Sequence, residues 1–302
     1  NEAMFTLAHI SDVHLGPLPG LTFLELLSKR ITGYVNWRRN RGKHLFGNTL
    51  ELLLEEIVKA RPSHLAITGD LVNLAADIEM DAAAQWLHAF HRPHDVSVVP
   101  GNHDAYVPGA LDKAIELWKP WMSGDQPRDD GHVFPYLRVR DNVALIGVST
   151  ATATPPFMAS GYFGPNQARR FELLLKETGA RGLFRVVMIH HPPIRGATPN
   201  YKRMMGIRRF HAAMHMDGAE LVLHGHTHLN TTYWIEGGTG RVPVIGIAAG
   251  SQNYGGHKPP SAYNLFHIGG EKGRWTLRKE RFSLTAGGEI FAKDHEETLL
   301  DA

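Results

Sequence analysis

The stretch LVLHGHTH, residues 221–228, places three histidines within five positions directly after a run of aliphatic residues. The aliphatic run has the length and composition of one buried strand. A single histidine beside a strand is most often a polar neighbour whose hydrogen bonds are satisfied. Three of them, at positions 224, 226 and 228, indicate a shared partner at the carboxyl end of that strand.

Other apolar runs have the same form, because each of them also ends in polar residues. We expect buried strands within residues 4–11, 64–69, 95–101, 142–149, 185–190 and 220–225. Helical patterns lie between them, and we expect helices at 49–60, 77–91, 108–118, 165–178 and 202–216, the first with Thr49 as its N-cap. This alternation of strands and helices predicts an α/β fold.

The last part of the chain has a different pattern. Apolar runs at 241–251, 262–269 and 274–284 are separated by turns rich in glycine or proline, with no helical pattern between them. They predict an antiparallel section or a second sheet, and the acidic tail at 293–302 is expected to be solvated or frayed. No repeat or linker divides the sequence, so we expect a single domain over residues 4–302.

Composition limits the classes of function. The chain has 302 residues, 43% hydrophobic and 21% charged, which suits one sizeable folded domain. It has no cysteine, so disulfides and thiolate metal sites are excluded and a metal must bind nitrogen and oxygen atoms, as Mn, Fe, Zn or Mg does. A net charge of +2 does not favour nucleic acid as a partner. No run reaches the about 18 apolar residues of a membrane span, and a cytoplasmic location is the expectation.

Candidate metal ligands follow strands that are far apart in the sequence. The carboxyl ends of parallel strands face one crevice, so these side chains are expected to converge there. The candidates are Asp12, His14, Asp70, Asn102, His190, His226 and His228. The set is too large for one small metal ion, whereas two ions that share a carboxylate would use all of it, as in two-metal phosphoryl-transfer sites.

The order of the motifs DxH, GD, GNHD, HHPP and GHTH resembles the calcineurin-like metallophosphoesterase family. The resemblance implies a four-layer α/β/β/α sandwich with two divalent or mixed-valence ions, Mn, Fe or Zn, above the two sheets. It implies that one ion binds Asp12, His14, Asp70 and His228, and the other Asp70, Asn102, His190 and His226. It also implies that His103 acts beside the metals rather than as a ligand, and a protonated His103 would stabilise or protonate the leaving alkoxide. Asp104, His191 and His224 stand close to candidate ligands in the sequence and are expected to support them, with simple packing as the alternative for the two histidines.

The resemblance is strongest to the bacterial phosphodiesterase branch of that family. The stretch GDLVNLA has Asn73 where protein phosphatases have an acid and purple acid phosphatases a tyrosine. The expected function is hydrolysis of a small phosphate ester, most readily a diester of cyclic nucleotide, glycerophosphodiester or nucleotide-lipid type, with a hydroxide between the metals as nucleophile. The alternatives are a nuclease and a silent scaffold that binds a protein partner. The sequence does not identify an oligomeric state.

An inserted segment at about 18–48 stands apart from these motifs. Leu24, Leu27, Ile31 and Val35 recur at helical spacing, and six basic residues accompany them: Lys29, Arg30, Arg38, Arg39, Arg41 and Lys43. Three interpretations remain open for such a basic amphipathic segment: a cap that packs on the domain, a guide for anionic substrates, and a helix on the anionic inner face of a membrane.

Overall fold

Two six-stranded sheets lie at the centre of the protein, in a computed structural model that describes residues 4–15, 49–90 and 92–302. The first sheet has the order β14 (Phe291–Leu300), β13 (Arg274–Leu284), β12 (Ala262–Glu271), β1 (Phe5–Ile10), β2 (His64–Ile67) and β3 (Val96–Val98). The second has the order β10 (Thr231–Glu236), β11 (Arg241–Gly246), β9 (Leu221–His224), β7 (Phe184–Met188), β5 (Val143–Gly147) and β4 (Tyr136–Arg140).

Both sheets have a parallel part, and the metal-ligand candidates follow strands of that part. β1, β2 and β3 are parallel neighbours in the first sheet, and β5, β7, β9 and β11 are parallel neighbours in the second. The remaining pairs, β12 to β14 among them, are antiparallel. Two of the three predicted runs form β12 and β13, an antiparallel section of the first sheet. The run at 241–251 does not join them, because β11 lies in the second sheet, parallel to β9 and antiparallel to β10.

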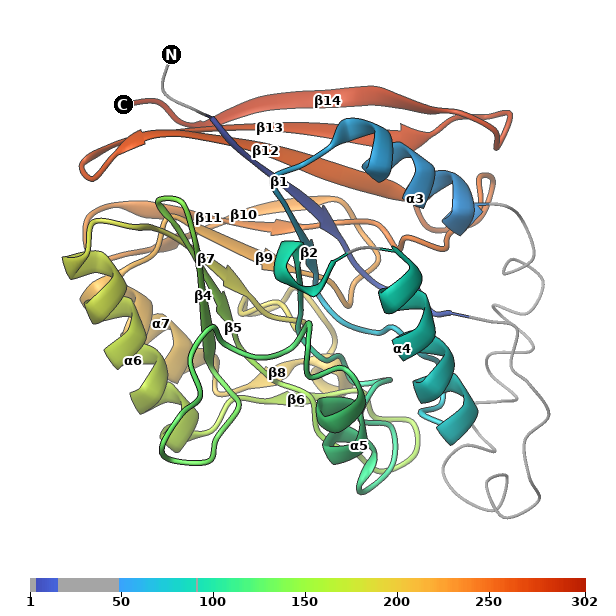
Figure 1. Ribbon diagram of the computed structural model, residues 1–302, viewed down its shortest axis with the longest axis horizontal. Helices are drawn as coiled ribbons and strands as arrows, with labels where there is room; N and C mark the ends of the chain where they lie inside the picture. The colour runs from blue at the N-terminus through green and yellow to red at the C-terminus, as the bar shows by residue number, and fades with distance from the viewer. Residues whose placement is uncertain (1–3, 16–48, 91) are drawn as a thin grey trace.

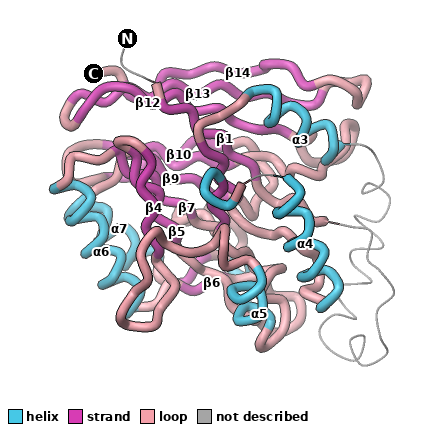
Figure 2. Tube along the Cα trace, viewed as in Figure 1, coloured by secondary structure: helices cyan, strands magenta, loops and turns pink. Residues whose placement is uncertain are grey.

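Helices cover the outer faces of the two sheets. They are α3 (Thr49–Ala60), α4 (Asp77–Phe90), α5 (Ala110–Leu117), α6 (Pro165–Ala180) and α7 (Ile207–Asp217), with short 3-10 turns at Pro93–Asp95 and Asn200–Lys202. Figures 1 and 2 show α6 and α7 on one outer side and α3 and α4 on the other. The fold is therefore the expected α/β/β/α sandwich. None of the described helices is long and apolar enough to cross a membrane.

Two apolar cores hold the layers together. The larger one joins residues of both sheets to α3 and α4, for example Leu7, Leu145 and Leu53, all fully buried. The smaller one fills the space between the second sheet and the pair α6 and α7, where Phe171 and Phe210 stack at 5.3 Å between ring centroids. The strand ends that carry the candidate site are thus fixed by close packing on both sides.

Other expectations about the elements also need correction. The helix expected at 202–216 begins at Ile207, because Gly206 has a φ of +100° and a two-stranded sheet of β6 (Gly161–Tyr162) and β8 (Met204–Met205) precedes it. Thr49 is the first helical residue rather than the N-cap, and its hydroxyl donates to the Asn253 side chain. The sequence patterns also missed β4 and β10.

The acidic tail at 293–302 is not frayed as expected, because most of it belongs to β14. It pairs with β13 in antiparallel register, and ion pairs cross between the two strands. Arg281 Nε lies 2.9 Å from Asp294 Oδ1, and Lys279 Nζ lies 3.2 Å from Glu297 Oε2. Opposite charges on facing strands stabilise such a pair, a relation that the acidic composition of the tail alone does not reveal. The basic segment at 18–48 lies outside the described residues.

Candidate metal centre

The loops after β1 and β2 carry the first three candidate ligands, and backbone hydrogen bonds continue the pairing of the strands into these loops. The N–H of Asp12 donates to the Gly69 carbonyl, and the N–H of His14 donates to the Asp70 carbonyl, both at 3.0 Å. The residues Asp12, His14 and Asp70 are at most 1% exposed. Two loops that are distant in the sequence therefore form one rigid wall of the site.

Five of the candidate ligands have a left-handed backbone. Their φ angles are +53° at Asp12, +42° at His14, +56° at Asp70, +72° at His226 and +58° at His228. Aspartate and histidine enter this region more readily than most residues, yet it still costs about 1–3 kcal/mol each. Left-handed residues turn the chain sharply, so ligands two positions apart can face the same point. Strain of this kind concentrates at functional sites, where the surrounding hydrogen bonds maintain it.

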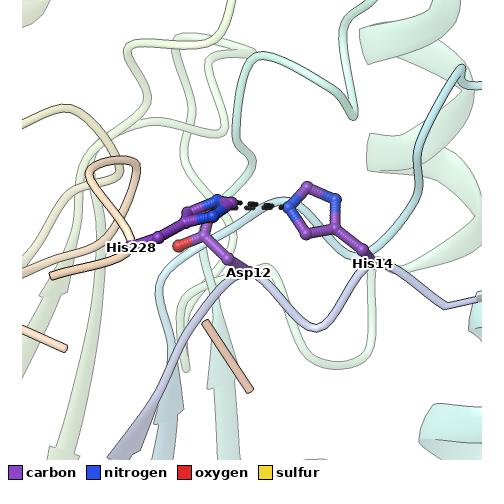
Figure 3. Close-up of side chains that lie close together, drawn as sticks. All are labelled: Asp12, His14 and His228. Atoms are coloured by element: carbon purple, nitrogen blue, oxygen red, sulfur yellow. Dashed lines mark hydrogen bonds and ion pairs between the residues drawn. The ribbon is translucent and has the colours of Figure 1, made fainter. Parts of the chain in front are cut away.

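The first group of potential ligands consists of Asp12, His14 and His228. Asp12 Oδ1 lies 3.1 Å from His228 Nε2 and 3.8 Å from His14 Nε2, and the two histidine nitrogens are 3.4 Å apart. Figure 3 shows the three side chains turned toward one another. A carboxylate oxygen and two imidazole nitrogens at this mutual distance are donors that can hold a metal ion together.

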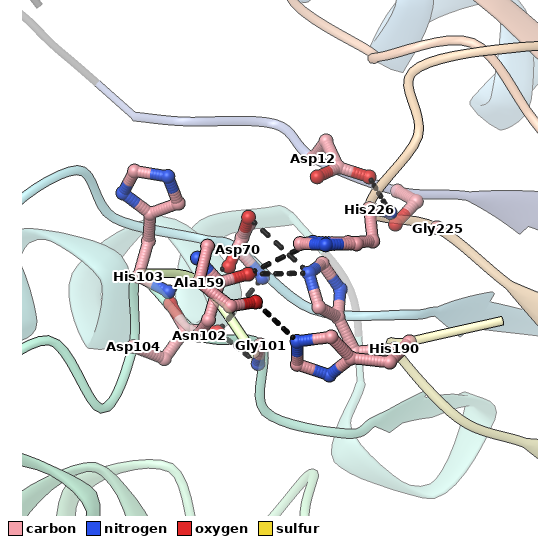
Figure 4. A network of polar contacts seen from close by, with 12 residues as sticks. Asp12, Asp70, Gly101, Asn102, His103, Asp104, Ala159, His190, Gly225 and His226 are labelled. Atoms are coloured by element: carbon pink, nitrogen blue, oxygen red, sulfur yellow. Dashed lines mark hydrogen bonds and ion pairs between the residues drawn. The ribbon is translucent and has the colours of Figure 1, made fainter. Parts of the chain in front are cut away.

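The second group consists of Asp70, His190 and His226, with Asn102 beside it. Asp70 Oδ2 lies 3.3 Å from His190 Nε2. The side-chain oxygen of Asn102 lies 3.1 Å from His190 Nε2 and 3.0 Å from His226 Nδ1. The four side chains come from the loops after β2, β3, β7 and β9, which meet in Figure 4.

Asp70 belongs to the second group and also faces the first. The same oxygen that faces His190, Oδ2, is 4.0 Å from His14 Nε2 in the first group. Its other oxygen, Oδ1, accepts the backbone N–H of His103 at 2.9 Å, which fixes the orientation of the carboxylate. The Asp70 carboxylate thus faces histidine nitrogens of both groups.

The loop after β9 reaches the loop after β1 only because residue 225 is glycine. A Cβ atom at Gly225 would lie 1.9 Å from Ser11 Oγ and 2.5 Å from Asp12 Oδ2. Without it, the His226 N–H donates to Asp12 Oδ2 at 3.0 Å. The glycine of the GHTH motif therefore permits the contact that brings both sheets to one site.

The electrostatics of the second group suit a cation. Burial raises the pKa of Asp70, but the neighbouring His190 and His103 hold that pKa well below its usual range. Burial lowers the pKa of His190, but the Asp70 carboxylate outweighs it and raises that pKa to about 9. The carboxylates therefore favour a positive charge at this point. Nitrogen and oxygen donors without thiolate fit Mn, Fe or Zn.

His103 belongs to neither group and lies beside them. Its ring meets the His14 ring edge-on at 5.0 Å and stacks on Tyr106 at 5.7 Å between centroids. Nδ1 lies 2.5 Å from the backbone carbonyl of Asn73, and because a carbonyl only accepts, Nδ1 carries the proton. Asn73 thus contributes its carbonyl at the position where the sequence lacks an acid. The sequence could not predict that the Asn73 carbonyl would accept this proton, because every residue has a backbone carbonyl.

Asp104 is part of the scaffold beneath the ligands. Its Oδ2 accepts the N–H groups of Asp70 and Gly101, each at 2.8 Å, and its Oδ1 accepts those of Leu71 at 2.9 Å and Val72 at 3.1 Å. Burial and the nearby Asp70 raise the pKa of Asp104 to about 7, although the backbone hydrogen bonds act to lower it. Asp104 therefore joins the loops after β2 and β3 and does not face the two groups.

His191 and His224 are buried near the ligands in different ways. His191 Nε2 lies 3.0 Å from the Ala159 carbonyl, and its ring is 4.4 Å from that of His226 between centroids. Burial and the neighbouring His190 lower the pKa of His191 to about 3. His224 Nδ1 contacts the Gly225 carbonyl at 2.9 Å, and burial lowers its pKa to about 4. Both are neutral rings, and His191 is the one packed against a candidate ligand.

Replacing Asp104 with asparagine should lower the free energy of unfolding by about 3 kcal/mol, because the amide NH₂ would face two buried N–H donors, each worth about 1–3 kcal/mol when unsatisfied. Urea unfolding, with and without a chelator, measures the change. Asp125→Asn is the matched control, since Asp125 also accepts a backbone N–H, from Val139 at 2.7 Å, but is exposed. Equal losses in the two variants would contradict a scaffold role for Asp104.

The chain was compared with known proteins. A family model described as calcineurin-like phosphoesterase matches residues 5–230. A dimetal phosphatase from Danio rerio has a similar structure, with a TM-score of 0.63, 14% identity and 99% of each chain covered. A purple acid phosphatase from yellow lupin seeds has a TM-score of 0.57 and 10% identity, and the match covers 98% of this chain but 54% of that one. No curated protein sequence matches the chain.

Proposed function

The chain belongs to the calcineurin-like phosphoesterase family, and from this premise we propose that it is a dinuclear metal-dependent hydrolase that prefers phosphodiesters. One observation carries the proposal. Two groups of buried carboxylates and imidazoles lie side by side, and Asp70 Oδ2 is within 4.0 Å of a histidine nitrogen in each. A shared carboxylate between two ligand groups is the arrangement of a two-metal hydrolytic site.

The proposed ligand sets extend the two groups by Asp70 and Asn102. One ion would be held by Asp12, His14, Asp70 and His228, and the other by Asp70, Asn102, His190 and His226. When bound, two such ions supply an activated water and neutralise charge on the phosphate oxygens. Mn, Fe and Zn all suit these donors. Asp104 and the rings of His191 and His224 hold the ligand loops in place from behind.

His103 is the proposed general acid. Its Nδ1 proton is bound to the Asn73 carbonyl, so Nε2 is the atom that can give a proton to the leaving alkoxide. Proton donation of this kind contributes about 100-fold to 10,000-fold to a rate. It matters most for an ester whose leaving group is a poor one, as in natural diesters of sugars and glycerol.

The preference for diesters rests on the stretch GDLVNLA. At its end Asn73 and Leu74 stand where protein phosphatases, to which the stretch bears a partial resemblance, have an acid and an arginine. A diester has one negative charge fewer than a monoester, so it depends less on added cationic groups around the phosphate. A small diester is therefore the substrate that this set of residues suits best.

A substrate panel tests the proposal. The protein, reconstituted separately with Mn, Fe and Zn, is assayed with bis-p-nitrophenyl phosphate, p-nitrophenyl phosphate, a cyclic nucleotide, a glycerophosphodiester, a nucleotide-lipid and DNA. We expect a higher kcat/KM for a small diester than for the monoester. Faster monoester turnover would contradict the preference, and DNA as the best substrate would favour a nuclease. Bound metals without hydrolysis of any substrate would favour the scaffold alternative.

We further propose a single domain over 4–302, a cytoplasmic location, and an inserted segment at 18–48 that contacts anionic lipid. Six basic residues in the segment support the contact with lipid, since each contributes about 1 kcal/mol to binding at an anionic surface.

Neutralising Arg38, Arg39 and Arg41 should reduce cosedimentation with anionic vesicles while turnover of a small diester stays the same. Absence of binding to anionic vesicles at low salt would exclude the lipid contact, and a raised KM would indicate substrate guidance instead.

A further inference from the structure

The turn between β2 and α4 presents the carbonyl that holds His103. This turn, residues 73–76, contains Asn73, which accepts the His103 Nδ1 proton, and Ala75, whose φ is +55°. A left-handed alanine is a strained conformation that needs support from its surroundings. The support comes from a side chain of α4, the helix that begins at Asp77 directly after the turn.

That side chain is Glu79, which is only 3% exposed and points back at the turn. Its Oε2 accepts the N–H of Asn73 at 2.9 Å, and its Oε1 accepts the N–H groups of Leu74 and Ala76, each at 3.0 Å. One buried carboxylate therefore binds most of the N–H groups of the turn, including that of the residue whose carbonyl faces His103.

We propose that Glu79 is a positioning residue for His103, which acts through the backbone of Asn73. The inference rests on the proposed function, in which His103 donates a proton to the leaving group. By fixing the Asn73 peptide, Glu79 keeps its carbonyl on Nδ1, so the transferable proton resides on Nε2. In enzymes with a Ser-His-Asp triad, a carboxylate accepts the Nδ1–H of the catalytic histidine directly. Here the Asn73 carbonyl accepts that proton, and the Glu79 carboxylate acts through the Asn73 peptide.

Glu79→Gln is the variant that isolates this role. With its oxygen kept on Leu74 and Ala76, the glutamine places an NH₂ group against the Asn73 N–H, two donors that cannot bond. We expect kcat for an alkyl diester to fall about 10-fold, less than the about 100-fold or more that a general acid contributes, because His103 itself remains. KM and metal content should be unchanged, and kcat for bis-p-nitrophenyl phosphate should change far less.

A double-mutant cycle shows whether the effect passes through His103. If it does, Glu79→Gln in a His103→Ala background causes no further loss of kcat, because the residue to be positioned is gone. Glu220→Gln is the matched control. Glu220 also accepts a backbone N–H, that of Arg185 at 2.6 Å, but in the second sheet, away from His103. It should lower thermal stability without altering the dependence on the leaving group.

The outcomes distinguish this inference from the proposed function. Multiplicative losses in the double variant, or equal losses for both leaving groups where His103→Ala shows unequal ones, would overturn positioning by Glu79. Equal losses in His103→Ala itself would overturn the acid role of His103 instead. The histidine ¹⁵N NMR spectrum of the zinc-loaded protein adds a readout independent of activity. We expect the neutral His103 ring of the parent protein to carry its single proton on Nδ1, so that the proton gained in the acid form is on Nε2. In Glu79→Gln we expect a mixture of the two neutral tautomers, and unchanged tautomer populations would contradict the inference.

Discussion

Replacing Asp70 with asparagine is expected to remove metal from both halves of the site and to lower kcat by more than about 100-fold. Asp70 Oδ2 is 3.3 Å from His190 Nε2 and 4.0 Å from His14 Nε2, so it is the oxygen that both ions would share. An amide offers one neutral oxygen to two cations. Changes to groups that only orient metal ligands already cost about 10-fold to 100-fold. Metal content after gel filtration and kcat for a small diester measure the two effects.

Asp12→Asn is the matched control, because Asp12 belongs to the first ligand group alone. This variant should lose one ion and keep the other, whereas Asp70→Asn should weaken both. An Asp70→Asn protein with two tightly bound ions and normal turnover would show that the carboxylate does not bridge. Loss of a single ion in both variants would assign Asp70 to one site only.

Replacing His103 with alanine is expected to lower kcat for an alkyl diester by about 100-fold to 10,000-fold while metal content stays near normal. The ring lies beside both ligand groups, and its backbone N–H, which fixes Asp70, remains in the variant. A nitrophenolate leaves without help from an acid. The loss for bis-p-nitrophenyl phosphate should therefore be much smaller.

The contrast between leaving groups decides the role of His103. Equal losses for alkyl and nitrophenyl diesters would argue against proton transfer and leave stabilisation of transition-state charge as its function. A Tyr106→Phe variant is a useful control, since it keeps the ring that stacks on His103 at 5.7 Å. It should leave the dependence on the leaving group as it is in the parent protein.

The sequence predicted the positions of the strands in the α/β part well, because buried parallel strands are continuous apolar runs with polar ends. The run at 221–224 and its polar end illustrate this, since β9 ends at His224 and the ligands His226 and His228 follow. The convergence of ligands within each sheet followed from the same geometry, because the strand ends of one sheet face the same side. That the two sheets meet at one site depends on tertiary contacts such as the hydrogen bond from the His226 N–H to Asp12 Oδ2.

Features that depend on tertiary contacts escaped prediction. The tail became β14 because its acidic residues face the basic residues of β13, and composition does not show which strand lies opposite. The left-handed turns at Asp12 and Asp70 depend on hydrogen bonds between loops. The link from Glu79 through the Asn73 carbonyl to His103 uses backbone atoms, which carry no sequence signature.

Metal stoichiometry tests the central claim most directly. The purified protein is reconstituted with Mn, passed through a desalting column, and analysed for metal per chain by mass spectrometry, alongside the Asp12→Asn and Asp70→Asn variants. Two adjacent ligand groups that share Asp70 predict two ions in the parent protein, one in Asp12→Asn and fewer than one in Asp70→Asn. A parent protein that hydrolyses diesters at full rate with a single bound ion would contradict the two-metal site.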